Sequence, residues 1–411
     1  GPALAVLGAV RAATPPEQLH VLRIPPLRST FDFMRTRIHV WWVAAGCLAA
    51  AVVVGGEPGG RDFDDCSAVV LINRGQAIFG GNYDMLGDDD GMLYIHKRGV
   101  VKTGTSASTT GVVARWTSRY ASVAFSLVGL QHAWAGMNER GLAFSTMRLE
   151  ATGNQPPDER PSVDWMWPQY ILDTCETVDD VIASDAAVRN WTVDHFLFTD
   201  RTGGVAVIEF LDGEMVAHSG AELCTTALTN TTYSYACGIW ESMRSGGDYS
   251  GLDNSLLRFC NIADRVSAFE GGTTSEAVDY AFETLSESYP PHLRRYTRWS
   301  IVFDTLNLRA YYRTYLEPEI RWVDLAAFDP RCGRPVMMLG INEVVSGDAT
   351  RAFWEYDPER NLEFREAYYE RWGIDYDPAQ TRELMEYVES FPCTRMRRAG
   401  ERKVVVGRER R

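Results

Sequence analysis

The chain has 411 residues, 45% of them hydrophobic and 23% charged, and its 55 acidic and 41 basic side chains give a formal net charge of −14. This is the composition of a globular protein, which excludes a disordered, collagen-like or coiled-coil chain and argues against a nucleic-acid-binding protein. Eight cysteines are too few for a disulfide scaffold of this length, and the sequence contains no CxxC pair that would indicate zinc.

The first 65 residues are predicted to be a leader that precedes the working domain. Residues 1–33 contain several prolines and no amphipathic period, and we interpret them as an over-extended start. In residues 34–56 a basic stretch precedes an apolar run of 15 residues, which is typical of a signal peptide and short for a membrane span. The alternative is a membrane anchor over residues 38–56. Residues 57–65 are rich in glycine and charge and are predicted to be a linker or propeptide.

From Cys66 onward, short apolar runs separated by turns predict strands paired in hairpins. The hairpins are expected over residues 66–81, 122–149 and 195–219, and two further strands over residues 298–304 and 308–315. Helices are expected in two blocks, residues 167–184 and 253–288, the second with apolar residues at the i, i+3, i+4 spacing of a helix face. Because hairpins and helices are grouped rather than alternating, the fold class is predicted to be α+β.

Residues 346–411 are rich in charged and aromatic side chains and are predicted to form a helical extension that ends in a basic tail. We interpret the tail as a solvated, frayed end rather than as a membrane or nucleic-acid patch. The working domain is therefore expected to span residues 66–345.

Cys66 is the candidate nucleophile because of its position after the leader and at the start of a strand. Cleavage directly before it would give one residue both a thiol and a free α-amine. An α-amine has an ordinary pKa of about 7.7–8, so it can accept the thiol proton without a histidine. The plainer alternative is that Cys66 is a buried apolar residue, which is the commoner role of a lone cysteine.

Four segments resemble, in chain order, the motifs of the choloylglycine hydrolase family. These Ntn (N-terminal nucleophile) amidases include bile salt hydrolases and penicillin V acylases. The segments are CSAVVLINRGQAIFGGNYDM, which begins at Cys66, GMNERGLAFSTMRL, ALTNTTY and DNSLLRF. GMNERGL alone would be a weak signal because such turns are common in hairpins. Four motifs in the same order between Cys66 and Arg313 are a much stronger signal.

The resemblance implies a four-layer αββα Ntn-hydrolase sandwich that hydrolyses a linear, non-peptide C–N amide bond of a small N-acyl substrate. The acyl group would form a thioester with the cysteine, with no cofactor and no metal. Activation would remove the leader by signal cleavage or by self-processing between Asp65 and Cys66. The enzyme would be periplasmic or secreted, without a nucleic-acid partner and in contact with a membrane only through the alternative anchor. A homo-oligomer is compatible with the family.

The resemblance also implies roles for individual residues. Cys66 would be the nucleophile, and Asp84 would orient its thiol or amine. The Asn230 side chain and the main-chain N–H of Arg148 would stabilise the oxyanion, and Arg258 would place a fixed positive charge near the thiol. Each residue also has a plainer interpretation that does not need the resemblance. These are a turn aspartate for Asp84, a loop asparagine for Asn230, a solvent-facing strand residue for Arg148 and a helix-surface arginine for Arg258.

At Gly81 the chain departs from the family, whose bile salt and penicillin enzymes have an arginine there. The departure argues against a close similarity in substrate. Arg115 or Arg119 are the candidates to supply the missing charge, because both precede a predicted strand. Four tryptophans are weighed as the lining of an acyl pocket against ordinary core positions: Trp116, Trp134, Trp165 and Trp167.

Two rival functions stay open. The first is an acyltransferase on the same scaffold, which would pass the acyl group to an amine instead of water. The second is a membrane-anchored, non-catalytic binding protein in which Cys66 never becomes the N-terminal residue.

Overall fold

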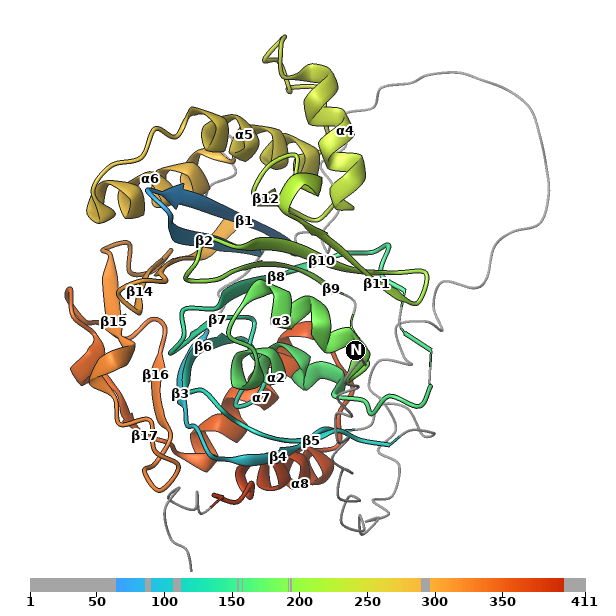
Figure 1. Cartoon of the computed structure of the whole chain (residues 1–411). Coiled ribbons are helices and arrows are strands. Elements are labelled where there is room, and N and C mark those ends of the chain that lie inside the picture. The colour runs from blue at the N-terminus through green and yellow to red at the C-terminus, as the bar shows by residue number, and fades with distance from the viewer. Residues whose placement is uncertain are drawn as a thin grey trace, which may run out of the picture.

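The computed structural model describes residues 64–394, except 86–89, 106–111, 154, 157, 191, 193 and 290–295 (Figure 1). The signal peptide or anchor, most of the predicted linker and the basic tail therefore lie outside the described residues. Among the helices of the described part, none has both the length and the apolar character that crossing a membrane requires.

Two antiparallel sheets form the centre of the molecule. The first has the strand order β12-β1-β2-β13-β14-β15. Its strands are β1 (Asp64–Asn73), β2 (Gln76–Met85), β12 (Ala227–Leu228), β13 (Thr297–Asp304), β14 (Arg309–Thr314) and β15 (Arg321–Asp324).

The second sheet has the strand order β11-β10-β9-β8-β7-β6-β3-β16-β17. Its strands are β3 (Met92–His96), β6 (Ser122–Ser126), β7 (Ala135–Asn138), β8 (Ala143–Arg148), β9 (Asp194–Thr199), β10 (Val205–Leu211), β11 (Glu214–Ser219), β16 (Met337–Gly340) and β17 (Trp354–Glu355). A separate ribbon pairs β4 (Val101–Thr103) with β5 (Arg115–Thr117).

Helices cover the outer faces of both sheets (Figure 1). On the first sheet lie α4 (Tyr233–Met243), α5 (Asn254–Ala268) and α6 (Thr274–Glu287), and on the second lie α2 (Trp167–Thr174) and α3 (Val178–Ala183). Short 3-10 turns occur at Asp164–Met166, Ser184–Ala186, Gly220–Glu222, Leu325–Ala327 and Thr350–Ala352. The predicted α+β class and the four-layer αββα sandwich are confirmed.

The β1–β2 hairpin shows how local sequence builds the centre of this sandwich. Arg74 and Gly75 form a two-residue turn with positive φ angles of 53° and 84°, the backbone that matches the twist of a hairpin. Both strands are buried along most of their length because helices cover one face and the second sheet covers the other. The hairpin therefore holds Cys66 in the middle of the molecule.

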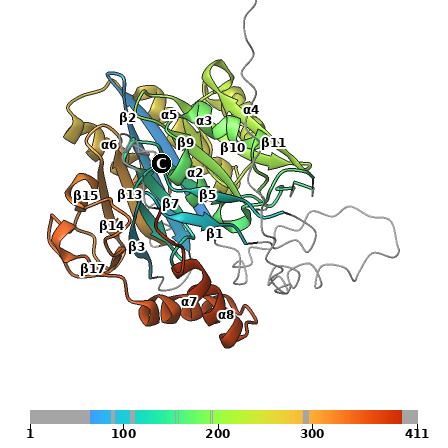
Figure 2. The same cartoon turned by 60° about the horizontal axis from the view of Figure 1, so that its bottom comes forward.

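The segment after residue 345 contributes to the second sheet before it becomes helical. β17 pairs with β16 at the sheet edge. The helices α7 (Pro358–Trp372) and α8 (Pro378–Glu389) then lie together at one end of the molecule (Figure 2). Each begins with an aspartate that caps the first turn and a proline at the first helical position. The segment after residue 345 thus holds two helices, preceded by a strand that belongs to the second sheet.

Candidate active site

Cys66 lies on β1 between β12 and β2, and it is fully buried in the uncut chain. Its cross-strand partner on β2 is Tyr83. Ala68, two residues further on, pairs with Gly81, and a Cβ at Gly81 would lie 3.1 Å from Ser145 Oγ on β8. Because residues two apart on a strand share a face, the Cys66 side chain points toward the second sheet.

The main chain of Cys66 contacts two of the residues that the sequence singled out. Its N–H donates to Asn230 Oδ1 at 2.8 Å, and its carbonyl oxygen accepts a hydrogen bond from the Arg258 guanidinium. Both polar groups of the Cys66 backbone are thus held by side chains from outside β1.

Asn230 follows β12 and is fixed by contacts on all sides. Its N–H donates to Ser255 Oγ at 3.0 Å, and its side-chain Nδ2 donates to the Arg148 carbonyl at 3.0 Å. Its Oδ1 accepts from Arg258 at 2.9 Å as well as from Cys66. Because Oδ1 accepts two hydrogen bonds and Nδ2 donates one to a carbonyl oxygen, the orientation of the Asn230 amide group is assigned.

Arg258 is buried on α5 with 0% relative exposure, so the plainer prediction of a helix-surface arginine is wrong. Its guanidinium donates to Ser67 Oγ at 2.8 Å, pairs with the Asp65 carboxylate at 3.1 Å and lies over the ring of Tyr289. A buried cation needs such partners because transfer out of water is costly. Arg258 therefore places a fixed positive charge next to the Cys66 backbone.

The Asp65 carboxylate is held by three side chains on the helix side of the first sheet. Besides Arg258, it accepts hydrogen bonds from Asn254 Nδ2 and, at 3.3 Å, from the Tyr289 hydroxyl. The residues on both sides of the Asp65–Cys66 peptide bond are thus anchored.

Asp84 lies on β2 opposite Asp65 and is fully buried, so the plainer prediction of a turn aspartate is wrong. Burial raises the pKa of Asp84 from 3.8 to about 7. The Arg258 charge and the Thr297 hydroxyl act in the opposite direction, and the charge of Asp65 raises the pKa further. The carboxyl group predicted to orient the nucleophile therefore titrates near neutral pH in the uncut chain.

Asp84→Asn is expected to stabilise the uncut chain in a pH-dependent way. Because the folded pKa of about 7 exceeds 3.8, wild-type stability falls as the pH rises from about 4 to about 7. Asparagine does not titrate, so the gain should approach about 4 kcal/mol above pH 7 and shrink toward pH 4. The free energy of unfolding of Cys66→Ala and of the Cys66→Ala, Asp84→Asn double variant at pH 5 and pH 8 checks this. Equal differences at both pH values would contradict it.

Arg148 ends β8 beside Asn230, and the contact seen is through its carbonyl oxygen. The donor role expected of its N–H stays a prediction. Arg115 and Arg119 both lie on the outer side of the second sheet. Arg119 donates to the Thr174 carbonyl at the end of α2. Arg115 is exposed on β5, and β5 packs against α2. Neither position is near β1, so the charge beside Cys66 comes from Arg258 instead.

An aromatic cluster borders Cys66, and only one of its members was considered from the sequence. The Tyr83 ring lies 5.7 Å from Trp134 and 5.2 Å from Trp299 between ring centroids. Gly91 makes room for Trp299, because a Cβ there would lie 1.5 Å from its ring. Tyr83 and Trp299 were missed, although Tyr83 lies inside the GGNYDM motif.

The other tryptophans considered for an acyl pocket have different places. Trp116 and Trp167 pack in the core between α2 and the second sheet, and Trp165 stacks on His132. The positions of Trp116 and Trp167 match the plainer prediction of core aromatics, whereas Trp165 is only partly buried.

Among the described cysteines, two disulfides form, Cys224–Cys237 and Cys332–Cys393. Burial raises the pKa of the Cys175 thiol to about 12 and that of Cys260 to about 11. Both are therefore thiols rather than thiolates at neutral pH. Within the described residues, no group of three or more histidine, cysteine or acidic side chains is placed to hold a metal ion.

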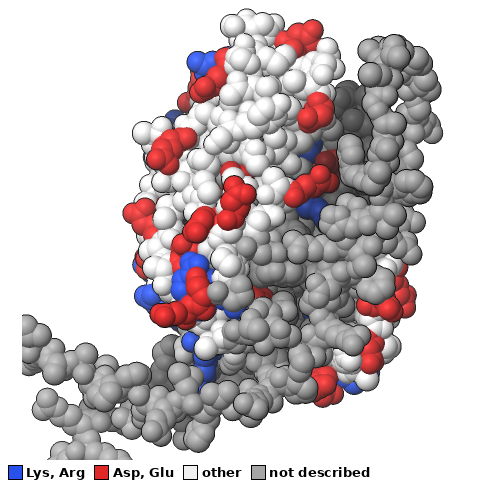
Figure 3. All heavy atoms as spheres, turned by 90° about the vertical axis from the view of Figure 1, so that its right-hand side faces the viewer, with Lys and Arg blue, Asp and Glu red and all other residues white. Residues whose placement is uncertain are grey.

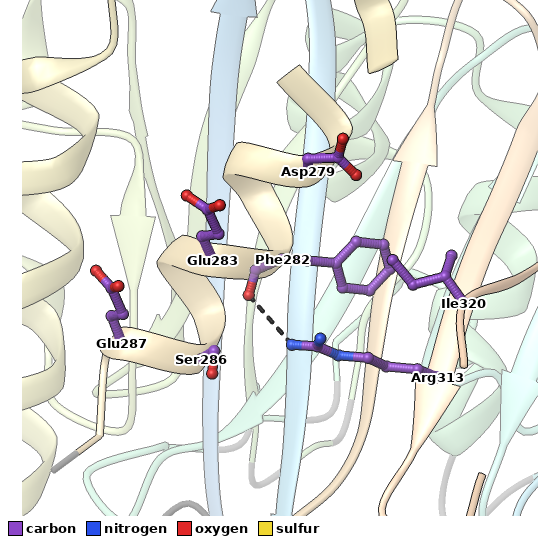
Figure 4. A pocket seen from close by; sticks show the side chains of 7 residues that line it. All are labelled: Asp279, Phe282, Glu283, Ser286, Glu287, Arg313 and Ile320. Carbon is purple, nitrogen blue, oxygen red and sulfur yellow. Dashed lines mark hydrogen bonds between the residues drawn. The ribbon is translucent and has the colours of Figure 1, made fainter. Parts of the chain in front are cut away.

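A shallow pocket of about 350 Å³ lies away from Cys66, between α6 and β14 (Figure 4). It is lined by Asp279, Phe282, Glu283, Ser286, Glu287, Arg313 and Ile320. The Arg313 guanidinium in it donates to the Phe282 carbonyl at 3.3 Å. None of the predicted site residues belongs to this pocket.

The charged side chains on the surface are consistent with the net negative charge of the sequence (Figure 3). Figure 3 shows acidic side chains spread over the described part of one face, without a continuous basic patch. Such a face is unsuited to a phosphate backbone.

Comparison with known proteins finds similar acylases and hydrolases. No family model matches the sequence. Penicillin V acylase from Pectobacterium atrosepticum is 25% identical over 335 residues, which cover 70% of this chain and 88% of the relative. The structure of penicillin V acylase from Agrobacterium tumefaciens superposes with a TM-score of 0.60 at 24% identity, over 71% of this chain and 98% of that one. A variant of conjugated bile acid hydrolase from Clostridium perfringens gives 0.55 at 14% identity, over 69% and 98%.

Proposed function

We propose that the chain is an Ntn amidase of the choloylglycine hydrolase family, and that it hydrolyses the linear amide bond of an N-acyl substrate with Cys66 as the nucleophile. The observation that carries this proposal is the contact of the Cys66 backbone with Asn230 and Arg258. These contacts bring three separate motifs of the chain to one buried point.

In the proposed reaction the free α-amine of Cys66 takes the proton from Sγ, and the thiolate attacks the carbonyl carbon of the substrate. The negative charge then develops on the former carbonyl oxygen. We assign the Asn230 Nδ2 group, which donates to the Arg148 carbonyl in the uncut chain, as a donor to this oxyanion. The α-ammonium returns its proton to the leaving amine, and water hydrolyses the acyl thioester.

Removal of the leader makes the site competent in this scheme. Cys66 is fully buried while Asp65 is attached, so neither its thiol nor an α-amine is available before cleavage. Cleavage removes the charge of Asp65 and creates an ammonium group close to Asp84. Both changes lower the pKa of Asp84, because a like charge leaves and an opposite charge appears. Asp84 would then be the carboxylate that holds the α-ammonium.

We place the cut between Asp65 and Cys66, and Asp65→Ala is expected to slow self-cleavage about tenfold or more. The substitution removes the hydrogen bonds from Arg258, Asn254 and Tyr289 that anchor the residue before the scissile bond. The intact mass of the purified precursor, followed over time, measures the rate. Activity per N-terminal Cys66 should equal that of the wild type, since Asp65 has left the mature chain. An unchanged cleavage rate would favour a separate signal peptidase.

The substrate class follows from the groups beside the thiol. Tyr83, Trp134 and Trp299 offer an apolar wall, which suits an aromatic or aliphatic acyl group. The relatives are named for penicillin V and conjugated bile acids. This chain lacks the arginine charge at Gly81, where even a Cβ would lie 3.1 Å from Ser145 Oγ. We therefore propose an N-acyl amide with an apolar acyl group.

Mass spectrometry of the mature protein with a panel of N-acyl amides tests this function. The expected result is an acyl adduct on Cys66 that disappears as free acid forms. If an added amine acceptor receives the acyl group in preference to water, the acyltransferase alternative is correct. If no amide in the panel acylates Cys66, the proposed activity is wrong.

We further propose that the protein is exported, as a periplasmic or secreted enzyme. Two disulfides support an oxidising compartment, because such bonds are rare in reducing cytosol. The anchored alternative predicts that the protein sediments with membranes.

A further inference from the structure

A buried acid–histidine pair lies next to the proposed oxyanion residue but outside the proposed chemistry. His195 on β9 and Glu209 on β10 have relative exposures of 0% and 1%. His195 Nδ1 lies 3.0 Å from Glu209 Oε1, and His195 Nε2 lies 2.6 Å from the Thr229 carbonyl oxygen. Thr229 directly precedes Asn230.

The hydrogen bonds satisfy the polar atoms of this pair. A carbonyl oxygen only accepts, so Nε2 of His195 carries a hydrogen and donates it to Thr229. Burial alone would raise the pKa of Glu209, but its contacts with His195 and His218 lower it to about 2. Nδ1 of His195 and Oε1 of Glu209 share a hydrogen bond, so each side chain gives the other a partner away from water, which is why both can be buried.

The pair clamps the peptide unit that carries Asn230. The carbonyl oxygen of Thr229 and the N–H of Asn230 belong to one planar peptide group. His195 holds the carbonyl end of this plane, and Ser255 Oγ accepts from its N–H end at 3.0 Å. With both ends held, the plane cannot rotate, and the direction in which the Asn230 side chain leaves the backbone is fixed.

Glu209 also holds the other end of the same segment. Its Oε1 accepts from the N–H of Tyr233, the first residue of α4, at 3.0 Å. The residue before α4, Thr232, makes no side-chain cap, so Glu209 takes the place of that cap. One carboxylate thus fixes residues 229–233 at both ends, through His195 and directly.

We propose that the His195–Glu209 pair is a positioning unit that aims the Asn230 amide at the oxyanion. This proposal rests on the proposed function for its catalytic consequence. The clamp itself is a property of the fold and does not need a substrate to be measured.

His195→Phe and His195→Gln separate positioning from mere stability. Phenylalanine keeps the ring and removes the donor, whereas glutamine places an N–H where Nε2 lies. His96→Phe is the matched control, because His96 is also a buried histidine in the second sheet, on β3. We expect His195→Phe to lower kcat about 10- to 100-fold with little change in KM, less than the loss of an oxyanion donor outright. His195→Gln should restore most of the activity, and His96→Phe should keep kcat per titrated Cys66.

Alkylation of Cys66 by iodoacetamide provides a second readout, because that reaction forms no oxyanion. It should proceed at the wild-type rate in His195→Phe. Unchanged kcat in His195→Phe would overturn the proposal, and so would a parallel fall of alkylation and kcat, which indicates collapse of the site. Equal defects of the phenylalanine and glutamine variants would overturn it as well.

Hydrogen–deuterium exchange over residues 227–233 tests the clamp without turnover. Faster exchange in His195→Phe than in wild type and His96→Phe supports the clamp, and unchanged exchange overturns it. If no N-acyl amide acylates Cys66 of the wild-type protein, the proposed function is wrong. The exchange measurement then still shows whether the His195–Glu209 pair holds residues 229–233.

Discussion

Cys66→Ala is expected to reduce amide hydrolysis about 10⁴-fold or more and to leave the leader attached. Losing the nucleophile of a covalent mechanism removes the steps that depend on it, and only binding and oxyanion stabilisation remain. Initial rates on the best N-acyl amide, together with the intact mass, measure both effects. Cys66→Ser should also be inactive if the thiol is required.

Cys175→Ala is the matched control for this prediction. Cys175 is also buried, but it lies in the core between α2 and the second sheet, away from β1. Its replacement should leave hydrolysis and leader removal intact. Turnover retained by either Cys66 variant would contradict the mechanism.

Asn230→Ala is expected to lower kcat about 10²–10³-fold with a small effect on KM, because an oxyanion donor acts mainly in the transition state. The same change removes the acceptor of the Cys66 N–H and a partner of Arg258. Rates must therefore be normalised to the amount of N-terminal Cys66, since leader removal is expected to suffer too.

Asn261→Ala provides a comparison for Asn230. Asn261 lies on α5 and also makes a side-chain hydrogen bond to a main-chain carbonyl, that of Ser288, at 3.0 Å. It should cost stability without changing kcat. An Asn230→Ala enzyme with wild-type kcat would remove Asn230 from the oxyanion site.

The hairpins and the amphipathic helices were predictable because their signals are local. The turn at Arg74 and Gly75 is specified by two adjacent residues. The apolar spacing of α5 and of α6 is likewise visible within the few turns of each helix. The hairpin expected over residues 122–149 was partly wrong, because strand pairing is interrupted between β6 and β7. β6 ends at Ser126, whose Oγ accepts from the N–H of Val128 and Gly129 in a turn, and β7 begins only at Ala135.

α4 was not predicted, and the reason is a long-range contact. Its first N–H is capped by Glu209, which lies 24 positions earlier in the chain. The residue before the helix, Thr232, makes no side-chain cap, so no local capping signal marks its start.

The candidate site was predictable only in part for the same reason. Four motifs named its residues, but the burial of Arg258, its pairing with Asp65 and the part played by Trp299 depend on strands and helices distant in the chain. A sequence pattern shows an arginine on a helix; only packing shows that the arginine faces inward. The His195–Glu209 pair had no sequence signal beyond two polar residues in apolar strands.

N-terminal sequencing of active protein, purified after export and supported by its intact mass, shows directly whether the mature chain begins with the nucleophile. The first residue is expected to be Cys66, with the thiol and the α-amine on one residue. An active protein whose chain begins at Gly55, or anywhere before Cys66, would contradict it.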